Sequence, residues 1–198
     1  MPPQTIVNVG YRSTNYWVIS VGTSRLLVDI GWPGTLGTMK ANLKKMGVPL
    51  EEIRYAVATH YHIDHAGLAE ELKREGVPLL IIEHQVNAIP LMKTWTKPVD
   101  KYVEVTMAGN IVVPFQESRT LLAKIGIAGE IVPTPGHSDH CVSLLLDDGS
   151  VFTGDLPPEG AAFDNPTALA SWQFLRQRGA KQVFPAHGPI RPIDPPPD

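Results

Sequence analysis

The sequence predicts an α/β fold in which two β-sheets pack face to face and helices cover their outer faces. Both halves of the chain contain short apolar runs typical of strands, and each half also contains segments with helical periodicity. The 198 residues, of which 43% are hydrophobic, suffice for one sizeable core. We therefore expect a single domain over residues 1–198.

The first half opens with three apolar or alternating segments that predict a meander of strands, over residues 5–9, 16–21 and 25–30. Residues 36–46 carry apolar side chains at helical spacing and precede Gly47, which predicts an amphipathic helix with a glycine cap. A strand, a helix and another strand are expected next, over residues 55–59, 64–75 and 77–82. Residues 83–113 show no sustained periodicity, so no element is assigned there.

The second half repeats the β-rich pattern. Its predicted strands cover residues 129–134, a hairpin over 141–155 around an Asp-Gly turn, and residues 181–186. A helix is expected over residues 166–178, starting on Pro166 and closing on Gly179. The terminal run 193–198 is predicted to be a disordered tail.

Charge and composition narrow the range of partners, locations and metal ligands. The formal net charge is −3 and no run of Lys or Arg could follow a phosphate backbone, which disfavours a nucleic-acid partner. Neither a signal-peptide pattern nor a membrane-spanning apolar run is present, so we expect a cytoplasmic protein that acts on a small molecule. Cys141 is the only cysteine, so a metal site here must use histidines and carboxylates.

Four potential metal ligands fall within six residues, directly after a predicted strand: His60, His62, Asp64 and His65. Residues two apart in extended backbone point the same way, so His60 and His62 can address one ion. Asp64 and His65 lie at the start of the predicted helix and can address a second ion. This density of ligands is rarely needed for folding, although a lone histidine usually has a structural role.

Three further candidates each follow a β-run beside Gly or Pro: His137, Asp155 and His187. Strand ends from several parts of a sheet can converge at one edge, where turns bring the backbone close to an ion. Imidazole and carboxylate ligands suit Zn²⁺, and Mn²⁺ or Fe²⁺ would also be accepted. The sequence thus predicts two divalent ions, with zinc as the first choice.

At these residues the sequence resembles the metallo-β-lactamase superfamily, whose His-x-His-x-Asp-His hallmark stands here at residues 60–65. The VDIG, TPGHS, TGD and PAHG segments follow in the family's order, so the resemblance covers essentially the whole chain. It implies a four-layer αββα sandwich of two mixed β-sheets. It also implies that His60, His62 and His137 bind one ion, that Asp64, His65 and His187 bind the other, and that Asp155 bridges both.

The resemblance does not point to antibiotic hydrolysis. The best-known class of true β-lactamases has a cysteine where Asp155 stands, and the histidine-rich lactamases do not use a bridging aspartate there. A compact metal-dependent hydrolase is expected instead, in which a hydroxide between the ions attacks the substrate and Asp64 holds or shuttles its proton. The expected substrate is a carboxylic ester, thioester or lactone. A phosphoester or phosphodiester hydrolase and an iron-dependent sulfur dioxygenase remain alternatives.

Several other residues are candidates for supporting groups. Asp29 is expected either to orient a ligand imidazole or to cap a turn, and Thr59 and Thr134 are weaker candidates for the same orienting role. Trp95 and Met92 either wall a substrate pocket or pack in the core. His140 is expected either on the surface or in the pocket, and His84 lies outside the predicted ligand set. Cys141 is expected in the core, and the Tyr61 hydroxyl is expected to point away from the ions.

Overall fold

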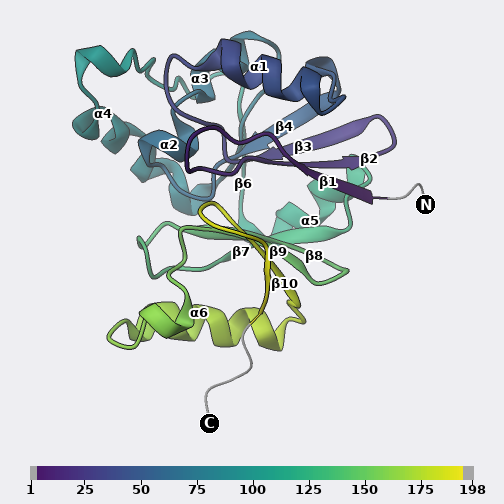
Figure 1. Ribbon diagram of the computed structural model, residues 1–198, viewed down its shortest axis with the longest axis vertical. Helices are drawn as coiled ribbons and strands as arrows, with labels where there is room; N and C mark the ends of the chain where they lie inside the picture. Colours follow the sequence, from purple (N-terminus) through teal and green to yellow (C-terminus); the bar gives the residue numbers. More distant parts are fainter. Residues whose placement is uncertain (1–3, 194–198) are drawn as a thin grey trace.

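A computed structural model of the chain describes residues 4–193 and confirms the predicted fold class. Two mixed β-sheets lie face to face, with helices on the outer side of each (Figure 1). The strand order is β1-β2-β3-β4 in the first sheet and β11-β10-β9-β8-β7 in the second. The termini of the described chain therefore belong to different sheets.

The first sheet contains the predicted meander. Its strands are β1 (Gln4–Asn8), β2 (Trp17–Val21), β3 (Ser24–Val28) and β4 (Ile53–Val57). Strand β2 is antiparallel to both of its neighbours, β1 and β3. Helix α1 (Leu36–Lys45) and the short 3₁₀ helix η1 (Leu50–Glu52) then return the chain, so that β4 runs parallel to β3.

The second sheet contains the predicted hairpin. Its strands are β7 (Gly129–Pro133), β8 (Val142–Leu146), β9 (Ser150–Gly154), β10 (Gln182–Pro185) and β11 (Arg191–Pro192). Helix α6 (Pro166–Gln177) connects β9 to the parallel strand β10. It begins on Pro166 as predicted, and the side chain of Asn165 caps it by accepting a hydrogen bond from the Ala168 N–H at 3.0 Å.

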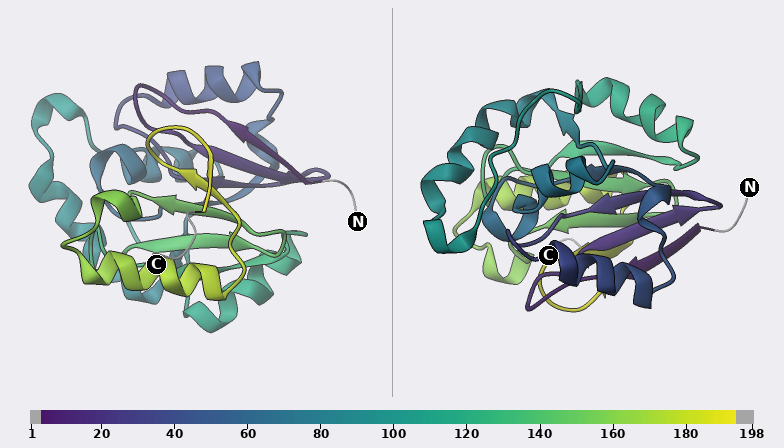
Figure 2. Two further views of the ribbon diagram at one scale, coloured as in Figure 1. Left: turned by 60° about the horizontal axis from the view of Figure 1, so that its bottom comes forward. Right: turned by 90° about the horizontal axis from the view of Figure 1, so that it is seen from above.

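Alternating side chains from the two sheets build three apolar layers. In β2 and β3, Trp17, Ile19 and Leu26 face the space between the sheets, while Val18 and Leu27 face α1 and the helices beside it. In β9, Phe152 joins the layer between the sheets and Val151 packs toward α6. The left view of Figure 2 shows α6 along the outer face of the second sheet. Both faces of each sheet are covered, which explains the continuous apolar runs in the sequence.

The predicted helix over residues 64–75 is wrong in one respect, because the structure contains two helices there. They are α2 (Ile63–Ala66) and α3 (Ala69–Arg74). The chain turns at Gly67, where Pro33 packs so closely that an added Cβ would lie 2.4 Å from its Cδ. Glycine has a low helix propensity and leaves room for this contact. The break leaves α2 as a short turn that presents Asp64 and His65 separately from α3.

The segment without periodicity is made of short elements. Within residues 83–113 they are η2 (Glu83–Leu91), α4 (Met92–Trp95), η3 (Pro98–Asp100) and β6 (Ile111–Val113). Strand β5 (Leu80–Ile82) precedes this segment and lies within the predicted strand 77–82. Helix α5 (Phe115–Lys124), which was not predicted from the sequence, follows it. Strands β5 and β6 pair in parallel, and an isolated bridge between Ala56 and Leu79 links this pair to the first sheet. Near the C-terminus, the short helix η4 (Glu159–Ala161) precedes α6.

Of the predicted tail 193–198, only Ile193 lies within the described residues. Its N–H donates to the carbonyl of Lys181 at 2.9 Å, so this residue is tied to the second sheet. Residues 194–198 lie outside the described part of the chain. Within residues 4–193, no helix has the length and apolarity needed to cross a bilayer.

Candidate metal centre

The structure brings the seven predicted ligands together at one edge of the sandwich. They come from loops that follow four different strands: β4 leads to His60 and His62, β7 to His137, β9 to Asp155 and β10 to His187. Strand β4 ends two residues before the predicted boundary, so His60 and His62 lie on the connection to α2. Asp64 and His65 lie on α2 itself. Two halves of the chain thus contribute to one site.

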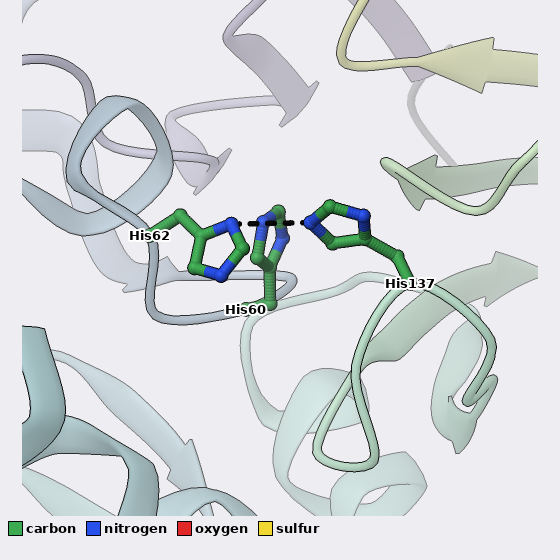
Figure 3. Close-up of side chains that lie close together, drawn as sticks. All are labelled: His60, His62 and His137. Atoms are coloured by element: carbon green, nitrogen blue, oxygen red, sulfur yellow. Dashed lines mark hydrogen bonds between the residues drawn. The ribbon is translucent and has the colours of Figure 1, made fainter. Parts of the chain in front are cut away.

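The first ligand group consists of His60, His62 and His137. The ring centroid of His60 lies 4.5 Å from that of His62 and 4.7 Å from that of His137. His62 Nδ1 and His137 Nε2 face each other at 3.1 Å, the contact drawn as a dashed line in Figure 3. All three offer a nitrogen within 4.8 Å of the others, which is close enough to hold one ion.

The second ligand group consists of Asp64, His65 and His187. The Nε2 atoms of His65 and His187 each lie 3.4 Å from Oδ2 of Asp64. Asp155 stands between the groups, because its Oδ2 lies 3.9 Å from His60 Nε2 and 3.3 Å from His65 Nε2. Its Oδ1 lies 3.3 Å from His187 Nε2. One carboxylate is therefore within reach of both groups.

Unpartnered buried atoms show that these side chains fit a cation. His60 Nε2, His65 Nε2 and Asp155 Oδ1 are buried and lack a hydrogen-bond partner among the described residues. An unsatisfied buried polar atom costs about 1–3 kcal/mol, so natural proteins seldom keep several together. His60, His65 and Asp155 each offer a ligand atom within 4.8 Å of the other two, and histidine nitrogens and carboxylate oxygens are the donors that Zn²⁺ accepts.

Asp29 has the orienting role that was one of its two expected roles. Its Oδ2 lies 3.1 Å from His65 Nδ1, and its Oδ1 accepts hydrogen bonds from the Thr59 N–H and hydroxyl, both at 2.9 Å. Since a carboxylate can only accept, His65 Nδ1 carries a proton in either charge state, and Nε2 faces the ligand group. Asp29 has the left-handed φ of +61°, which aspartate tolerates better than most residues.

Three further supporting groups were not found from the sequence. The Thr14 hydroxyl donates to Asp64 Oδ2 at 3.0 Å, and His187 Nδ1 lies 2.8 Å from the carbonyl of Ser13. Buried Gln85 donates through Nε2 to the carbonyls of Thr59 and His140, which flank the loops carrying His60 and His137. These residues belong to segments that approach the site only through the tertiary fold, so no local spacing marks them.

The charges of the site depend on one protonated histidine. Burial alone lowers the pKa of His65, but the charge of Asp29 and contacts with Asp155 and Asp64 outweigh it and raise the pKa well above its usual value. Burial lowers the pKa of His60, and neighbouring His65 lowers it further. Burial opposes ionisation of Asp64, yet contact with His65 brings its pKa down to about 2. In the metal-free protein, His65 therefore supplies a positive charge among three carboxylates.

The structure also shows where the remaining candidate residues of the site lie. The prediction that Thr134 orients a ligand is wrong, because its hydroxyl pairs with Ser143 at 2.7 Å. Cys141 is buried as predicted, and Tyr61 is buried in the hydrophobic core. His84 Nε2 lies 2.8 Å from the carbonyl of Asp139, and partly buried His140 lies 3.4 Å from the Ser138 hydroxyl.

Trp95 and Met92 have separated roles. Met92 is buried in the core, whereas Trp95 is 68% exposed. The Trp95 ring centroid lies 6.5 Å from that of His62, so the indole flanks the first ligand group. The structure supports the core interpretation of Met92, whereas Trp95 is neither in the core nor among the residues that line the cavity described below.

A cavity of about 720 Å³ opens beside ligands of both groups, including His137 and His187. Its other walls are mainly uncharged, from Leu156, Pro157, Pro158, Pro185 and Pro189. Arg191 also lines it, with its guanidinium 5.1 Å from the ring centroid of Trp172. A cavity of this size accommodates a small organic molecule next to the ligand groups.

The family model described as the metallo-beta-lactamase superfamily matches residues 9–187, a span that includes all seven ligands. The chain belongs to the metallo-beta-lactamase superfamily. This superfamily assignment accounts for the order of the motifs along the chain and for their meeting at one edge of two sheets.

Curated relatives in the superfamily have diverse descriptions. A beta-lactamase-like protein 2 homolog from Caenorhabditis elegans is 24% identical over 90% of this chain and 57% of its own length. A probable metallo-hydrolase from Methanocaldococcus jannaschii is 28% identical over 91% of this chain and 90% of its own length. An atrochrysone carboxyl ACP thioesterase from Aspergillus fumigatus is 26% identical over 90% of this chain and 38% of its own length. The chain thus spans about half the length of several relatives it matches.

Solved structures share the fold. A metallo-beta-lactamase family protein from Thermus thermophilus superimposes with a TM-score of 0.73 at 19% identity, covering 98% of this chain and 76% of the other. The B3 metallo-beta-lactamase BLEG-1 gives a TM-score of 0.72 at 20% identity, covering 96% of this chain and 94% of the other. At this identity the likeness establishes the sandwich fold and leaves the reaction to be argued from the site.

Proposed function

We propose that the protein is a binuclear metal-dependent hydrolase that cleaves a carboxylic ester, thioester or lactone. His60, His62 and His137 would hold one divalent ion, Asp64, His65 and His187 the other, and Asp155 would contact both. Zinc is the first choice, with Mn²⁺ and Fe²⁺ accepted by the same donors. When bound, the ions would lower the pKa of a shared water molecule and polarise the substrate oxygen.

The mainly apolar cavity beside both ligand groups is the observation that carries the choice of bond. An acyl group can lie against Leu156 and the proline walls, and Trp95 offers an apolar surface on the His62 side. A phosphoester would call for several cations or N–H donors around its oxygens, whereas the described lining contains one arginine, Arg191. The relative named as a thioesterase agrees with an acyl substrate.

The chain's own residues would prepare the reaction in two ways. Asp29 keeps the His65 ring in one orientation, so that Nε2 stays directed at the site. The contacts of Asp64 with Thr14, His65 and His187 all use Oδ2, and we assign the transient holding of the water proton to its Oδ1. The Asp64 carboxylate, whose pKa in the metal-free protein is about 2, would pass such a proton on to the leaving group.

The overall step balances without any co-reactant. The water oxygen attacks the carbonyl carbon, and one water proton passes to Asp64. The bond from that carbon to the alcohol oxygen or thiol sulfur then breaks, and the proton returns to the departing oxygen or sulfur. An iron-dependent sulfur dioxygenase, the alternative from another reaction class, needs one iron and would leave the Asp64, His65 and His187 group unexplained.

A substrate panel tests this proposal. Zinc-loaded protein is assayed with p-nitrophenyl acyl esters, acyl thioesters, a lactone and bis-p-nitrophenyl phosphate, with His62→Ala as the inactive control. We expect turnover of acyl substrates that a chelator abolishes. Activity confined to the phosphodiester would overturn the choice of bond, and oxygen consumption on a persulfide with one iron per chain would overturn the reaction class.

A further inference from the structure

The loop between β1 and β2, residues 10–15, contacts two ligands of the second group. The Thr14 hydroxyl donates to Asp64 Oδ2 at 3.0 Å, and the Ser13 carbonyl lies 2.8 Å from His187 Nδ1. Since a carbonyl only accepts, His187 carries its proton on Nδ1 and presents Nε2 toward Asp64 and Asp155. The loop thus determines both where Asp64 lies and which nitrogen of His187 is available.

The same loop also holds the chain on both sides of His187. The Asn15 N–H donates to the carbonyl of Ala186 at 2.7 Å. Its side-chain Nδ2 donates to the carbonyls of Pro185 at 3.0 Å and Gly188 at 2.9 Å. These three bonds join a loop of the first sheet to the end of β10 in the second sheet.

The loop is itself fixed in one conformation. Tyr11 and Thr14 exchange backbone hydrogen bonds at 3.0 and 3.3 Å, which closes the turn. Gly10 passes so close to this turn that an added Cβ would lie 2.4 Å from the Thr14 carbonyl oxygen. The side chain of Asn42, on α1, donates to the Gly10 carbonyl at 2.9 Å. Thr14 is 1% exposed, so its hydroxyl has little freedom to leave Asp64 for water.

We propose that residues 10–15 form a clamp that sets the affinity of the second ligand group, with Thr14 and Asn15 as its positioning residues. The inference rests on the proposed metal centre but not on its substrate. Without the clamp, Asp64 and His187 would have to be ordered when the ion binds, at a cost in side-chain entropy. Hydrogen-bond partners of metal ligands typically change metal affinity by about 10–100-fold.

Zinc titration of Thr14→Val tests the clamp, because valine keeps the shape of threonine and removes the donor. The affinities of both ions are measured by competition with a chromophoric chelator, and His187→Ala identifies the affinity that belongs to the second group. We expect Thr14→Val to weaken that affinity by about 10–100-fold and to leave the other unchanged. Thr14→Ser, which restores the hydroxyl, should recover it.

Thr134→Val is the matched control, because Thr134 is also buried but its hydroxyl pairs with Ser143. It should bind both ions as the wild type does. If Thr14→Val does not fold, Thr14→Ala removes the same donor without adding a methyl group. Wild-type affinity for both ions in the folded Thr14 variant overturns the clamp. Wild-type protein that binds fewer than two ions overturns the metal centre itself.

Discussion

The two ligand groups differ in how the fold holds them. In the second group each ligand has a fixed partner outside the group: Thr14 for Asp64, Asp29 for His65 and the Ser13 carbonyl for His187. In the first group, by contrast, the His62 and His137 rings are hydrogen-bonded to each other among the described residues. His60 alone is fully buried there, with its Nδ1 at 3.3 Å from the Thr59 hydroxyl.

The difference suggests that the two groups hold their ions with different affinities. Ligands that are already oriented lose little freedom on binding an ion, and the carboxylate of Asp64 adds charge to the second group. In the first group, His62 lies beside exposed Trp95, while the cavity wall includes His137 of the first group and His187 of the second. We infer that the second group mainly serves to hold its ion tightly, while the first group holds its ion less tightly. The variants below test that contrast.

Asp155→Asn should have the largest effect because this carboxylate contacts both groups. Asparagine keeps the shape but removes the charge that would attract two cations. Several kcal/mol of charge stabilisation depends on the ions, so kcat/KM should fall by roughly 1,000-fold. Steady-state kinetics with zinc analysis measures both effects. Near wild-type activity in the variant would contradict a shared role for Asp155.

Asp29→Asn should separate the two groups. Asparagine tolerates the left-handed backbone at this position, so the variant mainly removes the charge facing His65. We expect the second-group affinity for zinc to weaken by about 10–100-fold, with the first group nearly unchanged. Asp147→Asn, which affects an exposed ion pair with Arg119, is the control for loss of a carboxylate. Equal weakening of the zinc affinities of both groups would contradict the assignment of Asp29 to the second group alone.

Proton release should also distinguish the groups. The raised pKa of His65 means that an ion must displace its Nε2 proton, whereas the lowered pKa of His60 leaves that ring neutral. While the pH stays below the raised pKa of His65, second-group affinity should rise by about tenfold per pH unit. Charged His65 stabilises the metal-free fold at low pH, and this contribution is lost as pH rises through its raised pKa.

Calorimetry in buffers of different ionisation enthalpy measures this release. We expect about one proton for the second-group ion and fewer for the first. Asp64 and Asp155 would release none above about pH 5, because their pKa values are lowered and their carboxylates are already ionised. Proton release that accompanies the first-group ion instead would reverse the assignment.

Trp95→Ala should have the smallest effect and act on substrate alone. The side chain is 68% exposed, so its loss should leave folding and zinc affinity unchanged. For a long-chain acyl ester, loss of apolar contact should raise KM by about tenfold, with little change for an acetyl ester. Phe163→Ala removes another exposed aromatic residue as a control. A change in zinc content of Trp95→Ala would place Trp95 in the metal centre instead.

The sequence identified the candidate ligands, which the structure brings together, but it did not identify the residues that support them. The ligands are concentrated in one motif and three strand ends, which can be read from spacing alone. Thr14, Ser13 and Gln85 reach the site across sheets or between loops, and their neighbours in sequence carry no sign of it. Local pattern therefore cannot identify them.

Local pattern also explains the errors in the fold. Helix 64–75 has continuous amphipathic spacing, but the approach of Pro33 to Gly67 breaks it. Residues 83–113 form short elements whose few turns are too brief to show a period, as in α4 (Met92–Trp95). By contrast, α6 has a proline start, a capping asparagine and a terminal glycine, and it begins at the predicted residue.

Metal content of the purified protein tests the central claim most directly. Inductively coupled plasma mass spectrometry on zinc-loaded wild type, His62→Ala and His187→Ala should give two ions per chain for the wild type and one for each variant. The two variants should lose different ions, as judged by their remaining affinities. An active wild-type protein with one ion or none, or variants that retain both, would contradict the binuclear centre.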